Sequence, residues 1–294
     1  MPSAPIIPFP ALACPLDGNA LAPHGASWRC AAGHSFDVAS QGYVNLLPVQ
    51  NKRSRDPGDS KEMIAARRRF LEAGVYQPIA QAVTEATLAG LSPESTADCL
   101  DAGCGEGYYL RQLATAAKGR GQALALLGLD ISKWAVLAAA KQDSHTRWVV
   151  GSNANLPVLP GTLDRVLSVF GFPVYPEFAQ VLRPGGLLIQ VDAGRDHLRE
   201  LREIIYPSLK PERPASPAAP AGFSALPAAE TVRYTLALSS PEQIADLLVM
   251  TPHLYRASAE GRARATALKH LSLTVDVRLT RFERNCAEAA KVEA

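Results

Sequence analysis

Residues 98–109 read DCLDAGCGEGYY, and this stretch decides the fold of the chain. A short apolar run ends at Asp101, and glycine then recurs at alternate positions, as Gly103, Gly105 and Gly107. Glycine tolerates positive φ and lets the backbone come close to a ligand. The pattern predicts a strand, a tight turn and a helix whose free N-terminal amides face a polar or anionic ligand.

The glycine spacing differs from the dinucleotide fingerprint G-x-G-x-x-G. With Asp101 just ahead of the glycines, it resembles the first motif of class I S-adenosylmethionine methyltransferases. Residues 126–130 read as a second buried strand ending in Asp130, where a nucleotide-binding βαβ unit places its ribose acceptor. The resemblance implies S-adenosylmethionine as cofactor, whereas the alternative is an ordinary strand-to-helix turn with solvated carboxylates.

The bulk composition is that of a globular protein outside the membrane. The 294 residues can form one large domain and a smaller one, with 47% hydrophobic and 20% charged residues. A net charge of only +2 means that any nucleic-acid contact must come from a local patch. Five cysteines without disulfide-framework spacing suit a reducing compartment. With no signal peptide and no run of about 18 apolar residues, we expect a cytoplasmic protein without membrane association.

The middle of the chain alternates strand and helix patterns. The expected strands are 99–101, 123–130, 147–151, 163–169 and 187–191, and the expected helices between them are 107–118, 132–142 and 176–182. Such alternation predicts an α/β fold with a parallel sheet covered on both faces. Ligands bind at the carboxyl ends of such strands, where Gly103, Asp130, Asn153 and the 170–173 loop fall.

A small loop-rich module is expected over residues 14–48. Cys14 and Asp17 form one short knuckle, and Cys30 and His34 form a second about sixteen residues later. Sulfur and imidazole ligands suit tetrahedral zinc, although the usual first knuckle is Cys-x-x-Cys and here Asp17 takes the second place. The alternative is a vestigial knuckle with reduced thiols. The apolar run 42–48 is predicted to be a strand of the same module.

A basic segment follows the module. Between Lys52 and Arg69 there are seven basic and three acidic residues. This segment is the best candidate for RNA phosphate contacts, but a solvated, ion-paired helix face explains the same charges. A helix capped by Ser60 is expected there, and another over 79–91.

The C-terminal third is less regular. Residues 207–229 are rich in proline and alanine, and we expect a flexible insertion there. A strand is expected over 233–238, a helix over 240–250, and a late antiparallel edge strand over 274–281. His197 follows a strand end and is placed near the cofactor edge, although a lone histidine there is more often a surface or capping residue.

Several motifs together closely resemble one family, the bacterial 23S rRNA (guanine-N1)-methyltransferases of the RlmA/RrmA type. The matching segments are the two knuckles, 33–37, 42–50, 52–59, 62–63, 66–68, 70–76, 101–109 and 250–252. The resemblance implies a zinc-binding N-terminal module that helps present a 23S rRNA hairpin. It also implies that Gly105 and Glu106 contact S-adenosylmethionine, as do Tyr76 and His197.

The expected organisation is a class I S-adenosylmethionine-methyltransferase (Rossmann-like) domain with a small N-terminal zinc-ribbon-like module. Residues 1–50 form the RNA-recognition module, 51–96 a basic linker with helices, and 97–294 the methyltransferase domain, which carries the 207–229 insertion. The expected cofactor residues are Tyr76, Asp101, Gly103, Gly105, Glu106, Gly107, Asp130, Asn153 and His197. The oligomeric state is open between a monomer and a homodimer.

The chain departs from the family pattern in two places. Asp17 replaces a zinc cysteine, and the loop after the fourth strand reads Val-Phe-Gly-Phe-Pro at 169–173 instead of a Tyr-Ala-Pro-Cys-like run. That loop faces the target base in the family, so Phe170 and Phe172 could stack on a flipped guanine. Strand-end packing is the alternative role for both rings. A small-molecule methyltransferase and a binding protein without turnover are the rival functions.

Overall fold

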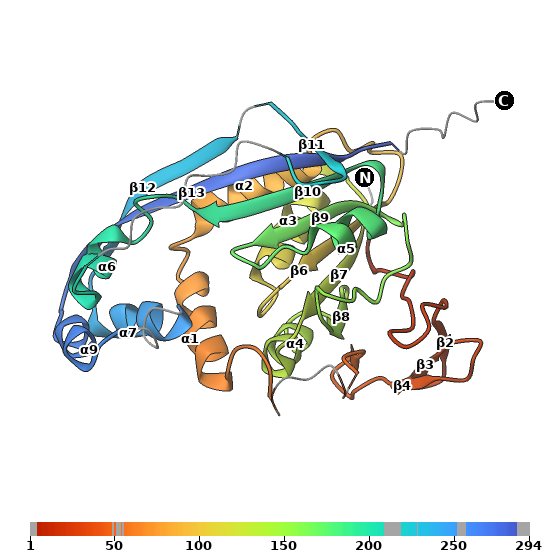
Figure 1. Cartoon of the computed structure of the whole chain (residues 1–294), viewed down its shortest axis with the longest axis horizontal. Coiled ribbons are helices and arrows are strands. Elements are labelled where there is room, and N and C mark those ends of the chain that lie inside the picture. The colour runs from red at the N-terminus through yellow and green to blue at the C-terminus, as the bar shows by residue number, and fades with distance from the viewer. Residues whose placement is uncertain are drawn as a thin grey trace.

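The computed structural model describes residues 5–48, 50, 54, 56–208, 219–227, 229–251 and 257–286. Among them, ten strands form one large sheet, in the order β11-β13-β10-β9-β6-β7-β8-β5, with β1 beside β7 and β12 beside β13 (Figure 1). The strands are β1 Ile6–Pro8, β5 Tyr43–Asn45, β6 Ala97–Ala102, β7 Leu124–Asp130, β8 Arg147–Val150, β9 Leu163–Val169, β10 Leu182–Ala193, β11 Phe223–Ala225, β12 Glu230–Leu238 and β13 Leu271–Arg284. A separate sheet contains β2 Ala22–His24, β3 Ser27–Arg29 and β4 Ser35–Asp37.

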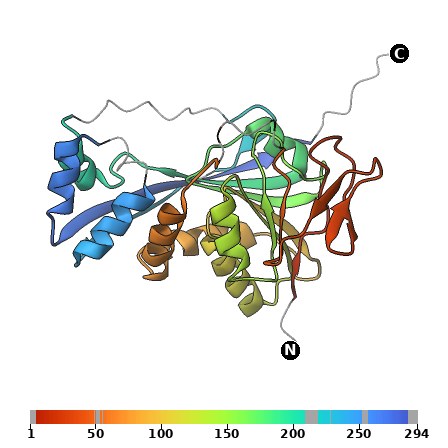
Figure 2. The same cartoon turned by 90° about the horizontal axis from the view of Figure 1, so that it is seen from below.

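Helices cover both faces of the large sheet. They are α1 Lys61–Glu72, α2 Gln77–Leu88, α3 Tyr108–Arg120, α4 Lys133–Ala140, α5 Tyr175–Val181, α6 Arg199–Ile205, α7 Pro241–Met250 and α9 Ala259–Thr266. Figure 2 shows α2, α3 and α4 on one face and α5 on the other. Each face therefore has its own apolar core, with Leu110 and Leu113 buried on the first and Phe178 on the second.

The five central strands confirm the predicted parallel α/β sheet. The strands β8, β7, β6, β9 and β10 pair in parallel. Most of their residues are buried because both faces of the sheet are covered, which is typical of parallel sheets. Their carboxyl ends lie along one edge, and this edge carries the glycine turn.

The late antiparallel strand predicted over 274–281 is confirmed as β13, but the prediction that it lies at an edge of the sheet is wrong. The long strand β13 lies inside the sheet, antiparallel to β10 on one side and to β12 and β11 on the other. Its Val275, Val277 and Leu279 are at most 2% exposed. Both of its edges are paired, so β13 is an interior strand of the sheet.

The N-terminal segment is joined to the large sheet more closely than predicted. The run 42–48 was expected in the small module, but its strand β5 pairs in parallel with β8. The strand β1 pairs in parallel with β7, and Phe9 and Leu12 just after it are fully buried. The small sheet is therefore anchored to the large sheet by the segments on both sides of it, β1 and β5.

Part of the segment predicted to be a flexible insertion packs on the large sheet. Residues 209–218 and 228 lie outside the described residues, but Phe223 in β11 is 5% exposed and pairs with β13. The expectation that little in 207–229 could pack is therefore wrong at β11. The helix α9 was not predicted. No helix in the described part of the chain is long and apolar enough to cross a bilayer.

Candidate cofactor and metal sites

The glycine turn after β6 has the backbone that its sequence predicts. Gly103, Gly105 and Gly107 have φ values of +97°, +56° and +83°, in the region that favours glycine. At Gly107 a Cβ would also lie 2.5 Å from the Trp148 ring, so α3 can begin here only with glycine before it. The amide of Gly105 donates a 2.9 Å hydrogen bond to Oδ2 of Asp130, which joins the ends of β6 and β7.

Asp101 lies at the end of β6 and is 1% exposed. Neither of its carboxylate oxygens has a hydrogen-bond partner among the described residues. Burial, with a smaller contribution from the charge of Asp130, raises the pKa of Asp101 to about 7. A buried acceptor without a partner costs free energy, so this carboxylate is suited to a ligand that donates a hydrogen bond or carries positive charge.

Two further buried acceptors at the same edge of the sheet lack partners within the described part. They are Oε1 of Glu106 and Oδ1 of Asn153. The other carboxylate oxygen of Glu106 is held by Arg111 at 2.7 Å and by Gln142 at 3.0 Å. A ligand with several donors, such as the amino and hydroxyl groups of S-adenosylmethionine, fits these acceptors together with the glycine turn.

Asp130 is oriented by its neighbours. The backbone amide of Ser132 donates to Oδ1 at 2.8 Å, and burial raises the carboxyl pKa although this hydrogen bond and that of Gly105 oppose the rise. Each carboxylate oxygen has a second lone pair, so Asp130 can still accept from ribose hydroxyls.

An aromatic cluster closes the site where three distant segments meet. Tyr76 is 3% exposed at the start of α2, and its hydroxyl lies 3.5 Å from Nε2 of His197. The Phe170 ring stacks on His197 at 5.6 Å and lies 6.2 Å from Tyr76, measured between ring centres. Phe170 has φ +54°, an uncommon and strained conformation for a residue with a side chain. The structure therefore brings both aromatic residues expected from the family resemblance together with Phe170.

Phe172 differs from Phe170 although it lies only two residues away. Its side chain is 88% exposed, against 38% for Phe170. Its backbone carbonyl lies 3.5 Å from Nδ2 of Asn153, which also lies 3.4 Å from the Ala102 carbonyl. The amide of Asn153 thus links the ends of three strands, and the two phenylalanines do not form one platform.

The predicted metal ligands converge. Cys14, Asp17, Cys30 and His34 each offer one ligand atom, and these four atoms lie within 4.8 Å of one another. Nδ1 of His34 is 3.1 Å from Oδ2 of Asp17, 3.4 Å from the Cys30 sulfur and 3.5 Å from the Cys14 sulfur. Two sulfurs, one nitrogen and one oxygen fit tetrahedral zinc.

Asp17 has a second role in its knuckle. Its Oδ1 accepts a 3.0 Å hydrogen bond from the amide of Asn19, which holds the Asp17 pKa well below its usual range. Burial raises the pKa of the Cys14 thiol to about 11. The knuckle turn is therefore held by a side-chain hydrogen bond in addition to any metal.

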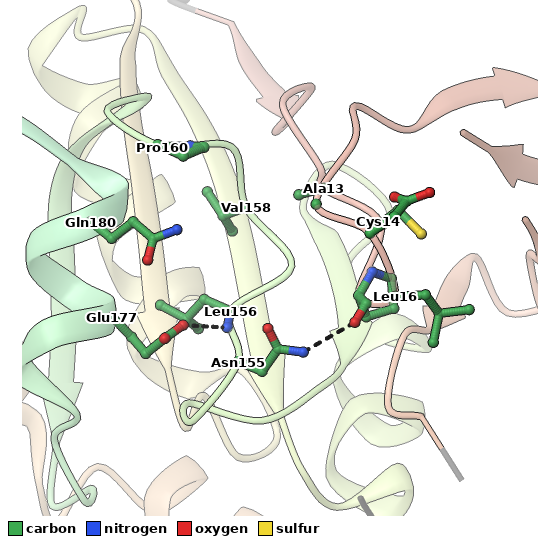
Figure 3. Close-up of a pocket in the computed structure, with 12 residues that line it drawn as sticks. Ala13, Cys14, Leu16, Asn155, Leu156, Val158, Pro160, Glu177 and Gln180 are labelled. Carbon is green, nitrogen blue, oxygen red and sulfur yellow. Dashed lines mark hydrogen bonds between the residues drawn. The ribbon is translucent and has the colours of Figure 1, made fainter. Parts of the chain in front are cut away.

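A cavity of about 310 Å³ lies between the metal module and α5 (Figure 3). Asn155 donates to the Pro15 carbonyl at 3.2 Å, and Glu177 accepts from the Leu156 amide at 2.9 Å. None of the expected cofactor residues lines this cavity. The first hydrogen bond joins the metal knuckle to the loop that follows β8, and the second joins this loop to α5.

In the described part of the basic segment the three arginines are ion-paired, as the alternative of an ion-paired helix face predicts. Arg67, Arg68 and Arg69 form ion pairs with Asp59, Glu72 and Asp246 respectively. Lys52, Arg53 and Arg55 lie outside the described residues. Arg67 lies beside the glycine turn, and sequence reasoning missed this placement because it treated the three arginines as one basic run.

Comparison with known proteins agrees with both sites. Residues 12–55 match the family described as "RlmA, N-terminal", a zinc ribbon, and residues 99–186 match a methyltransferase domain. The fold and the sites therefore define a methyltransferase with an N-terminal zinc ribbon.

Curated relatives narrow this class. A candidate 23S rRNA (guanine-N(1)-)-methyltransferase of Bacillus subtilis, YxjB, is 33% identical over 92% of this chain and 96% of its own. A candidate enzyme of the same name from Micromonospora griseorubida is 35% identical over 93% and 97%. The 23S rRNA (guanine(748)-N(1))-methyltransferase of Streptomyces fradiae is 36% identical over 66% and 67%. The chain belongs to the family of 23S rRNA (guanine-N1)-methyltransferases of the RlmA type, which confirms the resemblance.

Proposed function

We propose that this chain transfers a methyl group from S-adenosylmethionine to N1 of a guanine in a 23S rRNA hairpin. The observation that carries the proposal is the set of buried acceptors at the carboxyl edge of the sheet, above all the unpartnered carboxylate of Asp101. They surround a glycine turn in a chain whose family is that of 23S rRNA (guanine-N1)-methyltransferases.

The cofactor site follows from the placement of these groups. The glycine turn lets the cofactor approach the backbone, Asp130 accepts from the ribose hydroxyls, and Asp101 accepts from a donor group of the cofactor. The remaining contacts are proposed for Tyr76, Glu106, Asn153 and His197. Burial raises the pKa of the Tyr76 hydroxyl above its ordinary range, so this group stays protonated and can donate.

Methyl transfer depends on the alignment of the reacting groups and needs no covalent intermediate with the protein. Bound S-adenosylmethionine supplies a methyl group already activated by its sulfonium. Transfer would form the N1–C bond as the C–S bond breaks, with S-adenosylhomocysteine as the leaving group and the N1 proton released to water. The protein must therefore extract the base from its stack and hold N1 in line, and such alignment can contribute roughly 7–11 kcal/mol at the limit.

The loop after β9 is the proposed contact for the target base. Phe172 offers an exposed ring just after β9. Phe170 offers a partly exposed ring that packs on His197. Base stacking on aromatic side chains is sequence-tolerant, so recognition of the hairpin falls to other surfaces, with the zinc-ribbon module as the candidate.

The decisive experiment measures transfer of labelled methyl from S-adenosylmethionine to 23S rRNA that lacks the modification. Primer extension then locates the modified base, because N1 methylation blocks Watson–Crick pairing. A new stop at one guanine of a hairpin supports the proposal. Label at another position would identify a different target base. Cofactor binding without labelling of the rRNA would favour a binding protein of the same fold.

Three hypotheses accompany this proposal. The domain boundaries near residues 50 and 97 predict fragments that limited proteolysis would release. A homodimer is tested by sedimentation of the purified chain with and without rRNA. A cytoplasmic location is tested by fractionation of cells.

A further inference from the structure

Arg67 is the one arginine of α1 that reaches the glycine turn. A Cβ at Gly105 would lie 3.6 Å from Nη1 and 3.8 Å from Cδ of Arg67, so the guanidinium rests directly over this glycine. The positive charge also opposes the rise in the pKa of Asp130 that burial causes. Arg67 is thus next to the residue proposed to accept from the ribose.

The same guanidinium holds two other segments. Nη1 lies 2.6 Å from Oδ2 of Asp59, and Nη2 donates a 3.1 Å hydrogen bond to the Met250 carbonyl at the end of α7. The Arg67 side chain is 25% exposed and that of Asp59 30% exposed, so the pair is largely shielded from water. The planar fork of arginine suits such bridging, which a lysine ammonium cannot reproduce.

The linker held by Arg67 lies against the turn that follows β7. Ser132 donates from Oγ to the Asp59 carbonyl at 2.7 Å. Gly58 has φ +84°, and a Cβ there would lie 2.9 Å from both Ile131 and Ser132 side chains. Only glycine permits this approach, and Ser132 in turn orients Asp130 through its backbone amide.

We propose that Arg67 is a positioning residue that holds the linker at Gly58 and Asp59 over the nucleoside end of the cofactor site. It acts through the Asp59 carboxylate and the glycine turn, and it takes no part in methyl transfer. The inference rests on the proposed function, because it assigns a role at the cofactor site. It explains why the basic segment contains an acidic residue and a glycine at these positions.

The test compares two ligands. S-adenosylhomocysteine carries both the nucleoside and the amino-acid end of the cofactor, whereas 5′-deoxy-5′-methylthioadenosine carries only the nucleoside end. Calorimetry with the full chain gives the Kd of each for the unmodified protein and for Arg67→Met. We expect both Kd values to rise by the same factor, about tenfold, as for the loss of a hydrogen bond to a charged group.

Matched variants separate this role from general damage. Arg69→Met removes a neighbouring charge that is 62% exposed and paired with Asp246 of α7, and it should leave both Kd values unchanged. Arg67→Lys should retain part of the affinity. Asp59→Asn removes the ion pair without altering α1. It should raise both Kd values by a common factor, so the inference can be tested even if Arg67→Met proves unstable.

Two results would overturn the inference. One is unchanged binding of both ligands by Arg67→Met and Asp59→Asn. The other is a loss confined to S-adenosylhomocysteine, which would place Arg67 at the amino-acid end. If the unmodified chain bound neither ligand, the proposed function itself would fail, so the two failures are distinguishable.

Discussion

The hydroxyl of Tyr76 lies 3.5 Å from Nε2 of His197, although 121 positions separate the two residues. Nδ1 of the same imidazole accepts a 3.3 Å hydrogen bond from the backbone amide of Asp276, so the neutral ring carries its proton on Nε2. Nε2 therefore donates to the Tyr76 oxygen, and the Tyr76 proton is directed elsewhere. The hydroxyl is thus available as a donor to the cofactor.

Tyr76→Phe should weaken S-adenosylmethionine binding by roughly five- to tenfold, the effect of losing about one hydrogen bond. The ring packing against Phe70 and Phe170 is retained, but Nε2 of His197 loses the Tyr76 oxygen as its acceptor, so the melting temperature should fall slightly. Calorimetry and thermal denaturation check both statements. Tyr175→Phe is the control, because its hydroxyl bonds to Gln190 and the residue is outside the proposed cofactor set. An unchanged Kd for Tyr76→Phe would remove this hydroxyl from the cofactor site.

Phe170 and Phe172 should separate cofactor binding from RNA binding. Phe172→Ala removes an exposed ring that contacts no other ring within the described part, so it should raise the KM for rRNA and leave the cofactor Kd unchanged. Stacking of one base is worth about 1–3 kcal/mol, which corresponds to roughly five- to 150-fold. Phe170→Ala should weaken cofactor binding as well, because its ring packs on His197. Full activity of the double variant with normal rRNA affinity would show that neither ring stacks on the base.

The local sequence predicts the strands of the central parallel sheet but not the way in which the N-terminal strands join it. The strands β6 to β10 each contain a short cluster of apolar residues bounded by turns, and such clusters indicate strands without knowledge of their partners. The three-residue strand β1 was not predicted. The strand β5 was predicted but assigned to the small module, because its partner β8 lies more than a hundred positions away in the sequence. The same limit applies to Arg67, whose role depends on Asp59 and on the distant Met250 carbonyl.

The candidate sites divide in the same way. The glycine turn and the metal knuckles are short motifs with fixed spacing, so sequence alone could identify them. The proximity of Tyr76 and His197 came only from the family resemblance, since nothing in the local pattern of either segment indicates the other. The different surroundings of Phe170 and Phe172 depend on a strained backbone at the end of β9, which composition does not reveal.

Asp101 should make stability depend on pH in a predictable direction. The folded protein holds this carboxyl at a pKa of about 7, against an ordinary value of 3.8. Between these values the folded state binds one more proton than the unfolded state, so the free energy of unfolding falls as pH rises. From pH 5.5 to 7.5 the contribution of this group is about 2 kcal/mol.

Asp101→Asn should abolish this contribution. Urea unfolding of both proteins at pH 5.5 and 7.5 measures it, because other titrating groups cancel in the difference between variant and parent. The variant should gain stability relative to the parent at the higher pH. The same relative stability at both pH values would mean that Asp101 has its ordinary pKa and a partner in solution.

Removal of zinc should leave the N-terminal module folded. The Asn19 amide holds the Asp17 knuckle, and Trp28 is 4% exposed beneath the Arg147 guanidinium, 4.7 Å from the ring centre. Strands β1 and β5 further anchor the module to the large sheet. Chelation should therefore lower the melting temperature modestly, without loss of the part of the near-ultraviolet circular dichroism that Trp28→Phe removes. Loss of that signal on chelation would show that the metal is required for the fold.

Asp17→Cys should tighten zinc binding, because a thiolate is a softer ligand than a carboxylate and restores a three-cysteine, one-histidine set. Competition with a chromophoric chelator measures the affinity, and we expect a gain of at least about tenfold. Asp37→Cys adds a thiol to β4 outside the four-residue cluster and is the matched control.

Asp17→Cys should also lose the hydrogen bond from the Asn19 amide, so its metal-free form should be less stable than that of the parent. A tighter site with an equally stable metal-free form would show that the Asp17 hydrogen bond contributes nothing. An unchanged zinc affinity would mean that position 17 does not bind the metal.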